Sequence, residues 1–333
     1  MKVKVIISLF ISAILFPSLL LAETNSDPRP PWNQWVQQVR KEALANGIRP
    51  EVFDEAFAGI KQPHRKTLNL DKRQPEKRLT YIKYRNTRGD AYRIKLGKKY
   101  YKKYQPLLEQ VGQEYGVSPC MITALWGIES SYGNYLGSFP VIQSLATLAY
   151  DQRRGAFFRK QLMIALKILN DGHIDLKSFK GEWAGASGHP QFLPSSWYKY
   201  AVDYNGDGHK DIWKNHADVF ASIANYLLQN GWQTGEPWDI EVQVPPGFDT
   251  ALMGKENKLK VSQWQAMGVR NKNGGPLPYP ELEASIIEPY GGPHLLTYKN
   301  FDVIKRYNNS TYYAGTVGYV AEGICNIDWL QTY

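Results

Sequence analysis

Apolar residues recur every three or four positions through the middle of this chain. Three segments show this spacing and carry a glycine at or near their end: CMITALWGIESSYG (120–133), GAFFRKQLMIALKILNDG (155–172) and ADVFASIANYLLQNGW (217–232). The period matches that of an α-helix, and glycine often terminates helices because it adopts positive φ angles without steric strain. The pattern predicts helices that pack through their apolar faces, and so a mainly α-helical fold.

The pattern changes after Trp238. In DIEVQVPPGF (239–248) apolar residues alternate with polar ones, as in a half-buried strand, and further short β-like runs follow between Gly, Pro and Asn clusters. Residues 301–333 are again helical in pattern, as are amphipathic segments within 32–118. We therefore expect a small β subdomain at 238–300 set against a mainly helical protein.

The N-terminus has the pattern of a secretory signal peptide. Lys2 and Lys4 precede an apolar run over 5–21, and Ala22 supplies the small residue before a polar stretch. The alternative is an uncleaved membrane anchor, although the run is near the lower length limit for a span. No cysteine follows the run directly, so we expect cleavage after Ala22 and an exported, soluble, periplasmic protein without a lipid anchor.

Charge and motif content exclude several classes of function. The formal net charge is +9, which favours a polyanionic partner; for an exported protein this indicates the cell envelope. No recognition helix or zinc-finger spacing supports nucleic acid as a partner. GxSxG, HExxH, Walker and dinucleotide-binding motifs are absent from the sequence. The two cysteines, Cys120 and Cys325, form either a disulfide in an oxidising compartment or two separate buried thiols.

Glu129 is the candidate catalytic residue. It stands in the last turn of a predicted helix that ends at Gly133, beside the apolar residues Trp126 and Ile128. The negative end of the helix dipole and partial burial both disfavour the carboxylate and raise its pKa. A carboxylic acid kept protonated in an apolar pocket is what a general acid for glycosidic cleavage requires. The alternative is a glutamate that turns out to solvent.

A second motif, GEWAGASGHPQFLPSSW (181–197), is rich in small residues that let another surface approach closely. Gln191 and Phe192 within it supply an amide and an aromatic ring suited to the wall of a cleft. The alternative is a tight structural turn.

A third motif, DYNGDGHKDIW (203–213), matches the first half of an EF-hand loop, with Gly208 at the sharp turn. Its oxygen-rich side chains favour a hard cation such as Ca²⁺. The twelfth position holds Lys214 instead of the usual glutamate, so an aspartate further on is expected to complete the shell. The alternative is a solvated turn. The expected calcium ligands are Asp203, Asn205, Asp207, His209 (through its carbonyl) and Asp218.

Taken in order, the three motifs resemble those of the membrane-bound lytic transglycosylase B family of bacterial envelopes. The resemblance covers residues 30–320, and several ordered motifs agree, so it is more specific than any one of them. The supporting segments are DKRQPEKRLTYIKY (71–84), RIKLG (93–97), EYGV (114–117), ANYLLQNGW (224–232) and RYNNSTYYA (306–314).

The resemblance implies a lysozyme-like helical core with an extra helical domain, a small β subdomain and an EF-hand-like calcium loop. The expected divisions are a signal peptide (1–22), an N-terminal helical domain (23–118), the catalytic core with the calcium loop (119–237), the β subdomain (238–300) and a C-terminal helical segment that completes the core (301–333).

The resemblance also implies an activity. The chain would cleave the β-1,4 bond between N-acetylmuramic acid and N-acetylglucosamine in peptidoglycan and leave a 1,6-anhydromuramoyl end, with Glu129 as the single acid and then base. Ca²⁺ would be structural, and no organic cofactor is expected. We expect a monomer that binds glycan strands, with other cell-wall enzymes as further partners. The residues implied to contact substrate are Arg153, Arg154, Gln191, Phe192, Tyr226, Tyr307 and Asn308.

One departure from the family pattern is Ser187, which stands where a methionine is common and would alter the wall of the cleft. Two rival functions remain. A hydrolytic muramidase would use the same acid but add water, and only its product would differ. A non-catalytic, calcium-stabilised wall-binding protein would retain its function in a Glu129→Gln variant.

Overall fold

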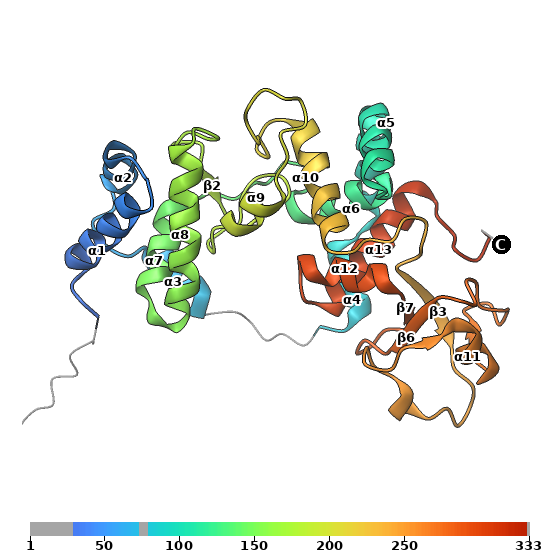
Figure 1. Ribbon diagram of the computed structural model, residues 1–333. Coiled ribbons are helices and arrows are strands. Elements are labelled where there is room, and N and C mark those ends of the chain that lie inside the picture. Colours follow the sequence, from blue (N-terminus) through green and yellow to red (C-terminus); the bar gives the residue numbers. More distant parts are fainter. Residues whose placement is uncertain (1–28, 73–78, 332–333) are drawn as a thin grey trace, which may run out of the picture.

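The computed structural model describes residues 29–72 and 79–331 (Figure 1). The expected signal peptide at 1–22 and part of the motif at 71–84 lie outside the described residues. Over the described part, the chain forms thirteen α-helices, two short 3-10 helices and seven strands. The mainly helical class predicted from the apolar spacing is therefore confirmed.

Five helices precede the predicted core. The first buries Trp35, Val39 and Ala43 at four-residue spacing, and the second begins with Pro50 in its first turn, where the missing N–H costs nothing. The fifth departs from helical geometry at Tyr104, two residues before Pro106, because proline disturbs the preceding turn. The bounds are α1 (Trp32–Ala45), α2 (Pro50–Phe57), α3 (Arg65–Lys72), α4 (Tyr81–Arg88) and α5 (Ala91–Tyr115).

Helix α6 (Pro119–Ser130) lies at the centre of the helical core. All of its residues from Cys120 to Gly127 are buried, as expected for a helix that other helices surround. Helix α5 and the C-terminal α13 (Thr311–Cys325) pack against it. A disulfide joins Cys120 to Cys325 with their Cα atoms 6.0 Å apart, so of the two alternatives for the cysteines the structure has the bridge.

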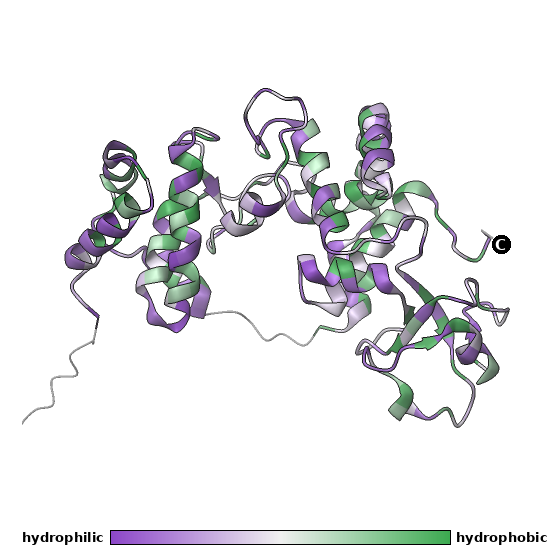
Figure 2. Ribbon diagram, in the orientation of Figure 1, coloured by the Kyte–Doolittle hydropathy of each residue, from purple (hydrophilic) through white to green (hydrophobic). Residues whose placement is uncertain are grey.

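The remaining core helices are amphipathic. Along α8 and α10 the colouring alternates between hydrophobic and hydrophilic residues (Figure 2), which matches the spacing of their buried positions. Helices α7 and α8 pack against each other, and α12 packs against α13. The bounds are α7 (Val141–Tyr150), the 3-10 helix η1 (Gln152–Arg154), α8 (Gly155–Asn170), α9 (Pro194–Tyr200), α10 (His216–Gln229) and α12 (Lys299–Tyr307).

A five-stranded antiparallel sheet lies where the alternating pattern predicts strands. The strand order is β4-β6-β7-β3-β5, and Ile240 and Val242 of β3 point into a small apolar core around Trp264. A separate two-stranded ladder pairs β1 (Phe139–Pro140) with β2 (Lys180–Gly181). The sheet elements are β3 (Asp239–Gln243), the 3-10 helix η2 (Thr250–Leu252), β4 (Leu259–Lys260), α11 (Val261–Ala266), β5 (Arg270–Asn271), β6 (Glu283–Ile287) and β7 (His294–Thr297).

The helices form two groups in space. In Figure 1, α1, α2, α3, α7 and α8 lie at one end, whereas α4, α5, α6, α12 and α13 gather at the other, with α9 and α10 between them and the sheet below α12. Helices α4 and α6, from the first half of the chain, both pack against α13 from its end. The surroundings of α6 are therefore built from distant parts of the sequence.

Candidate active site

The end of α6 carries Glu129, and local interactions fix where the helix stops. Ser131, just after the last turn, adopts a left-handed conformation with φ 51°. The guanidinium of Arg93 donates to the Gly127 carbonyl and to the Ser131 hydroxyl, which satisfies groups at the helix terminus that would otherwise lack partners. Gly133 follows with φ 81°, and a Cβ at this position would overlap the His189 ring, so only glycine fits the turn.

The Glu129 side chain faces a cavity of about 590 Å³. Its wall comes from α4, α5, α6, the 182–191 segment, the end of α12 and the start of α13, which lie far apart in the sequence. The cavity mixes aromatic, charged and amide groups. The lining residues are Tyr84, Arg88, Arg93, Ile128, Glu129, Ser131, Tyr135, Glu182, Ala186, Gln191, Tyr307, Asn308 and Tyr313.

Burial raises the pKa of the Glu129 carboxyl to about 7, and a hydrogen bond from the Tyr313 hydroxyl to Oε1 partly offsets that rise. Burial is the main cause, as predicted from the apolar neighbours in the sequence. A carboxyl with a pKa near neutrality both donates and accepts a proton readily at physiological pH. Burial also raises the pKa of Tyr313, so its hydroxyl keeps its proton.

Gln191 lines the same cavity and presents an unsatisfied acceptor. Its backbone has φ 50°, and its Nε2 donates to the Gly188 carbonyl at 2.9 Å. The Oε1 atom is buried, and no described residue gives it a hydrogen bond. Because buried polar atoms nearly always find partners, this oxygen is suited to accept a hydrogen bond from a ligand.

The other predicted substrate residues divide into two layers. Tyr307 and Asn308 line the cavity, and the Tyr307 hydroxyl donates to the Pro190 carbonyl at 2.6 Å. Phe192 is only 2% exposed and packs behind them, its ring centroid 5.7 Å from that of Tyr226 and 5.8 Å from that of Tyr307. Tyr226 is also buried and lines a neighbouring surface hollow instead. Phe192 and Tyr226 therefore support the wall from behind.

Arg153 and Arg154 do not line the cavity around Glu129. Both lie in η1, and both form ion pairs with Asp71, whose side chain is 5% exposed; the distance from Arg154 is 2.7 Å. Because a buried carboxylate needs charged partners, this pair neutralises Asp71 and ties α3 to the start of α8.

Ser187 is 3% exposed, and the cavity is lined instead by the neighbouring Ala186. The Ser187 backbone pairs with Phe192 through two hydrogen bonds of 3.0 and 3.1 Å. Ser187 itself therefore lies behind the lining of the cavity.

Several residues that line the cavity were not predicted from the sequence. Tyr313 lies inside the quoted motif at 306–314, but nothing in the sequence showed that its hydroxyl would reach Glu129. Glu182 is the second residue of the motif at 181–197 and brings a second carboxylate to the cavity. Arg88 and Tyr84 of α4 add a cation and a ring, four residues apart on one helix face.

The 203–218 loop folds around its own carboxylates. Asp203 accepts backbone hydrogen bonds from residues 206, 207 and 208 at 2.8–3.1 Å, and Asp218, fully buried, accepts them from Tyr204 and Asp211. Burial raises the pKa of Asp218, and the charges of Asp203 and Asp207 add to that rise. Across 29–72 and 79–331, no three His, Cys, Asp or Glu side chains are gathered as a metal-binding group. The expected ligand set is therefore only partly assembled.

None of the helices within the described ranges is both long and apolar enough to cross a membrane.

Comparisons with known proteins agree with this fold. A family model described as "Transglycosylase SLT domain" matches residues 31–322. The chain is 31% identical over 252 residues to membrane-bound lytic murein transglycosylase B of Escherichia coli K12, covering 73% of this chain and 67% of that protein.

Two solved structures are similar as well. SltB3 from Pseudomonas aeruginosa, in complex with NAG-anhNAM-pentapeptide, superposes with a TM-score of 0.86 and 42% identity over 88% of this chain and 79% of that one. The Escherichia coli lytic transglycosylase Slt35, in complex with calcium, superposes with a TM-score of 0.75 and 28% identity. The match covers 90% of this chain and 94% of that one.

Proposed function

This chain belongs to the transglycosylase SLT domain family of murein lytic transglycosylases, and on that premise we propose that Glu129 cleaves the β-1,4 bond between N-acetylmuramic acid and N-acetylglucosamine to leave a 1,6-anhydromuramoyl end. One observation carries this proposal: a half-buried glutamate with a pKa of about 7 lines a cavity of about 590 Å³ and accepts a hydrogen bond from a tyrosine. The complex of the related SltB3 with an anhydromuramoyl peptide supports the same substrate class.

Glu129 would act first as an acid and then as a base. Its protonated carboxyl gives a proton to the leaving glycosidic oxygen. The resulting carboxylate then removes the proton of the muramoyl 6-hydroxyl, which attacks the anomeric carbon within the same sugar. An intramolecular nucleophile has a high effective concentration, which favours it over water. The Tyr313 hydroxyl stabilises the carboxylate formed between the two steps and holds it in position.

The substrate contacts follow from what lines the cavity. Gln191 Oε1, which lacks a partner among the described residues, would accept a hydrogen bond from a sugar hydroxyl or acetamido N–H. Tyr307 and Asn308 would contact the glycan directly. Phe192 and Tyr226 would act through Tyr307 by holding its ring in place. Arg153 and Arg154 would order the neighbouring helices through Asp71.

A second candidate function is hydrolysis by the same acid, and Glu182 is the observation that favours it. Hydrolytic glycosidases use two carboxyl groups, one as acid and one as nucleophile or base. Glu182 lines the cavity together with Glu129, so a second carboxylate is present. If Glu182 activates water, the product carries a reducing end; if it only binds substrate, the anhydro product remains.

Mass spectrometry of products from purified peptidoglycan distinguishes these functions. The wild type is expected to release anhydromuropeptides, Glu129→Gln to release none, and Glu182→Gln to release the same anhydro products as the wild type. Products heavier by one water, lost in Glu182→Gln, would establish a muramidase. Equal product release by Glu129→Gln and the wild type would exclude Glu129 as the acid.

We also propose a structural Ca²⁺ in the 203–218 loop, held by Asp203, Asn205, Asp207, the His209 carbonyl and Asp218. The loop sequence supports this proposal, as do the mutual repulsion of its carboxylates and the calcium complex of Slt35. Ca²⁺ would relieve that repulsion and order the loop before α10. Chelation by EDTA should lower the Tm of the wild type but not that of Asp203→Asn; an unchanged wild-type Tm counts against the site.

The setting of the enzyme is proposed on the same basis. A peptidoglycan substrate and the signal-like residues 1–22 support action in the periplasm, as a monomer on glycan strands and alongside other cell-wall enzymes. Size-exclusion chromatography with light scattering tests whether the protein is a monomer. Fractionation of cells tests whether it is in the periplasm.

A further inference from the structure

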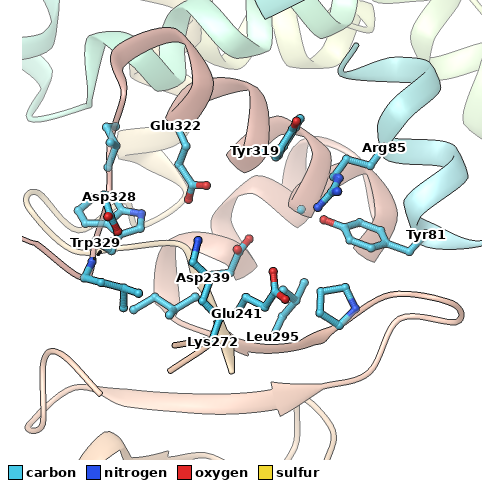
Figure 3. Close-up of a pocket in the computed structure, with 15 residues that line it drawn as sticks. Tyr81, Arg85, Asp239, Glu241, Lys272, Leu295, Tyr319, Glu322, Asp328 and Trp329 are labelled. Atoms are coloured by element: carbon cyan, nitrogen blue, oxygen red, sulfur yellow. Dashed lines mark hydrogen bonds between the residues drawn. The ribbon is translucent and has the colours of Figure 1, made fainter. Parts of the chain in front are cut away.

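A second cavity, of about 380 Å³, lies between α4, α13, strand β3 and the segment after α13 (Figure 3). None of its lining residues lines the cavity around Glu129. It sits where the β-sheet meets the helical core, and such junctions are common places for ligand sites. The proposed catalytic mechanism does not use it.

Negative charge predominates in this second cavity. Asp239 and Glu241 of β3 and Glu322 of α13 line it, and Figure 3 shows the Asp239 and Glu322 carboxylates directed towards the same space. The lining also contains Asp328 and two cations, Arg85 and Lys272. The Arg85 guanidinium lies 4.5 Å from the centre of the Tyr319 ring. The excess of carboxylates disfavours an anionic ligand.

Asp239 has an oxygen without a partner. Its Oδ2 atom is buried, and no described residue donates a hydrogen bond to it. Glu322, across the cavity, accepts a hydrogen bond from the Trp238 indole at 3.0 Å, and the Trp329 side chain also interacts with it. A buried carboxylate oxygen that lacks a donor is costly, and so unusual in a folded protein. A donor from outside the chain would remove that cost.

The electrostatics agree with a missing cation. Burial raises the pKa of Asp239 well above its usual range, and the negative charge of Glu322 raises it further, although the positive charge of Arg85 partly offsets the rise. Burial likewise raises the pKa of Glu322 to about 7. A positive group between the two would favour both carboxylates.

The aromatic residues of the lining indicate which kind of cation fits. Tyr81, Tyr319 and Trp329 line the cavity beside the carboxylates. Faces of aromatic rings attract organic cations and cover their carbon chains. Within the described ranges no three acidic, His or Cys side chains form a metal-binding group, so a bare metal ion fits less well.

We propose that this second cavity binds a small organic cation, with a primary ammonium or guanidinium group donating to Asp239 Oδ2 and Glu322 and its carbon chain against Tyr319 and Trp329. This ligand site is additional to the proposed transglycosylase function, because it shares no lining residue with the cavity around Glu129. A ligand here would join strand β3 to helix α13 and stabilise the contact between sheet and helices.

Isothermal titration calorimetry with cadaverine and agmatine tests the proposal, with 1,5-pentanediol as the uncharged control. We expect saturable binding of both cations, none of the diol, and about tenfold weaker binding to Asp239→Asn, the loss expected for one charge-assisted hydrogen bond. The matched control is Asp54→Asn, which removes an exposed carboxylate paired with Arg40 and should bind like the wild type. Equal binding to Asp239→Asn and the wild type, or none to the wild type, overturns the proposal.

Tyr319→Leu provides a second variant at a partly exposed position, where the loss of the ring should not disturb folding. It should weaken cadaverine binding several-fold, and unchanged binding would contradict the role of the ring. Product release from peptidoglycan, measured on the same samples, should stay at the wild-type rate in both variants. That result shows that they are folded and separates a failure of this site from a failure of the proposed function.

Discussion

The two cavities each contain a carboxyl whose pKa burial raises to about 7, yet the two groups are placed differently. Glu129 ends a helix, receives a hydrogen bond from the Tyr313 hydroxyl and faces a cavity of about 590 Å³. Glu322 also lies in the last turn of its helix, but it faces a cavity of about 380 Å³, opposite a second carboxylate that lacks a donor. A raised pKa alone therefore does not identify an acid catalyst; the other groups in the cavity and the room for substrate decide.

The largest expected difference between the cavities is in catalysis. Glu129→Gln should lower the rate of product release by about 10³-fold, in the range expected for loss of a general acid–base group. Glu322→Gln, an equally conservative change at a carboxyl with a similar pKa, should lower it less than twofold. Initial rates on purified peptidoglycan measure both. A large loss in Glu322→Gln would show that the second cavity also serves the reaction.

The hydrogen bond from Tyr313 is the next feature to remove. It lowers the pKa of Glu129, so Tyr313→Phe should raise that pKa and keep the acid protonated to higher pH. In the plot of kcat/KM against pH, the alkaline limb should move to higher pH. The maximum rate should fall about tenfold because the carboxylate is less well stabilised. Tyr319→Phe, in the second cavity, is the matched control and should leave the profile unchanged. An unshifted limb in Tyr313→Phe would mean that the bond does not control the pKa.

The disulfide connects the two cavities mechanically. Cys120 belongs to α6, which carries Glu129, and Cys325 ends α13, which carries both Tyr313 and Glu322. Cys120→Ser with Cys325→Ser should lower the free energy of unfolding by about 2–4 kcal/mol, the usual effect of losing a native bridge. Denaturant unfolding measures this loss. An unchanged unfolding midpoint would indicate that packing alone holds α6 against α13.

The smallest expected effect is on stability against pH. The folded-state pKa of Glu129 and of Glu322 lies above the unfolded value, so the folded state binds more protons between about pH 4.5 and 7. The stability that these carboxyls contribute is present at the acid end and is lost as the pH rises through 7, by an order of 1–3 kcal/mol each. Glu322→Gln should flatten the curve of unfolding free energy against pH. Parallel curves for this variant and the wild type would contradict the raised pKa.

Local sequence patterns predicted part of the candidate site well. The apolar run from Cys120 to Ile128, followed by Gly133, placed Glu129 in the last turn of a buried helix, and burial is the main cause of its raised pKa. Residues within one or two helical turns surround one another whatever the rest of the chain does. Their environment is therefore readable from the sequence.

The remaining parts of the site depend on long-range packing. Tyr313 reaches Glu129 from 184 positions away, and Glu182 reaches the same cavity from a loop. Arg153 and Arg154, expected to contact the substrate, form ion pairs with Asp71 of the protein itself. A local motif indicates which side chains are present in a segment. The partner that each side chain meets in space depends on which helices pack together.

The sequence by itself determined the helical class, the strand at 239–243 and the helix end that carries Glu129, because each follows from periodicity or from contacts between near neighbours. The family followed from the resemblance of several ordered motifs. Only the tertiary structure decided that the cysteines pair, that Phe192 lies behind the cavity wall, and that Asp239 and Glu322 face one cavity. Each of these outcomes joins segments far apart in the chain, and no local pattern encodes how such segments pack.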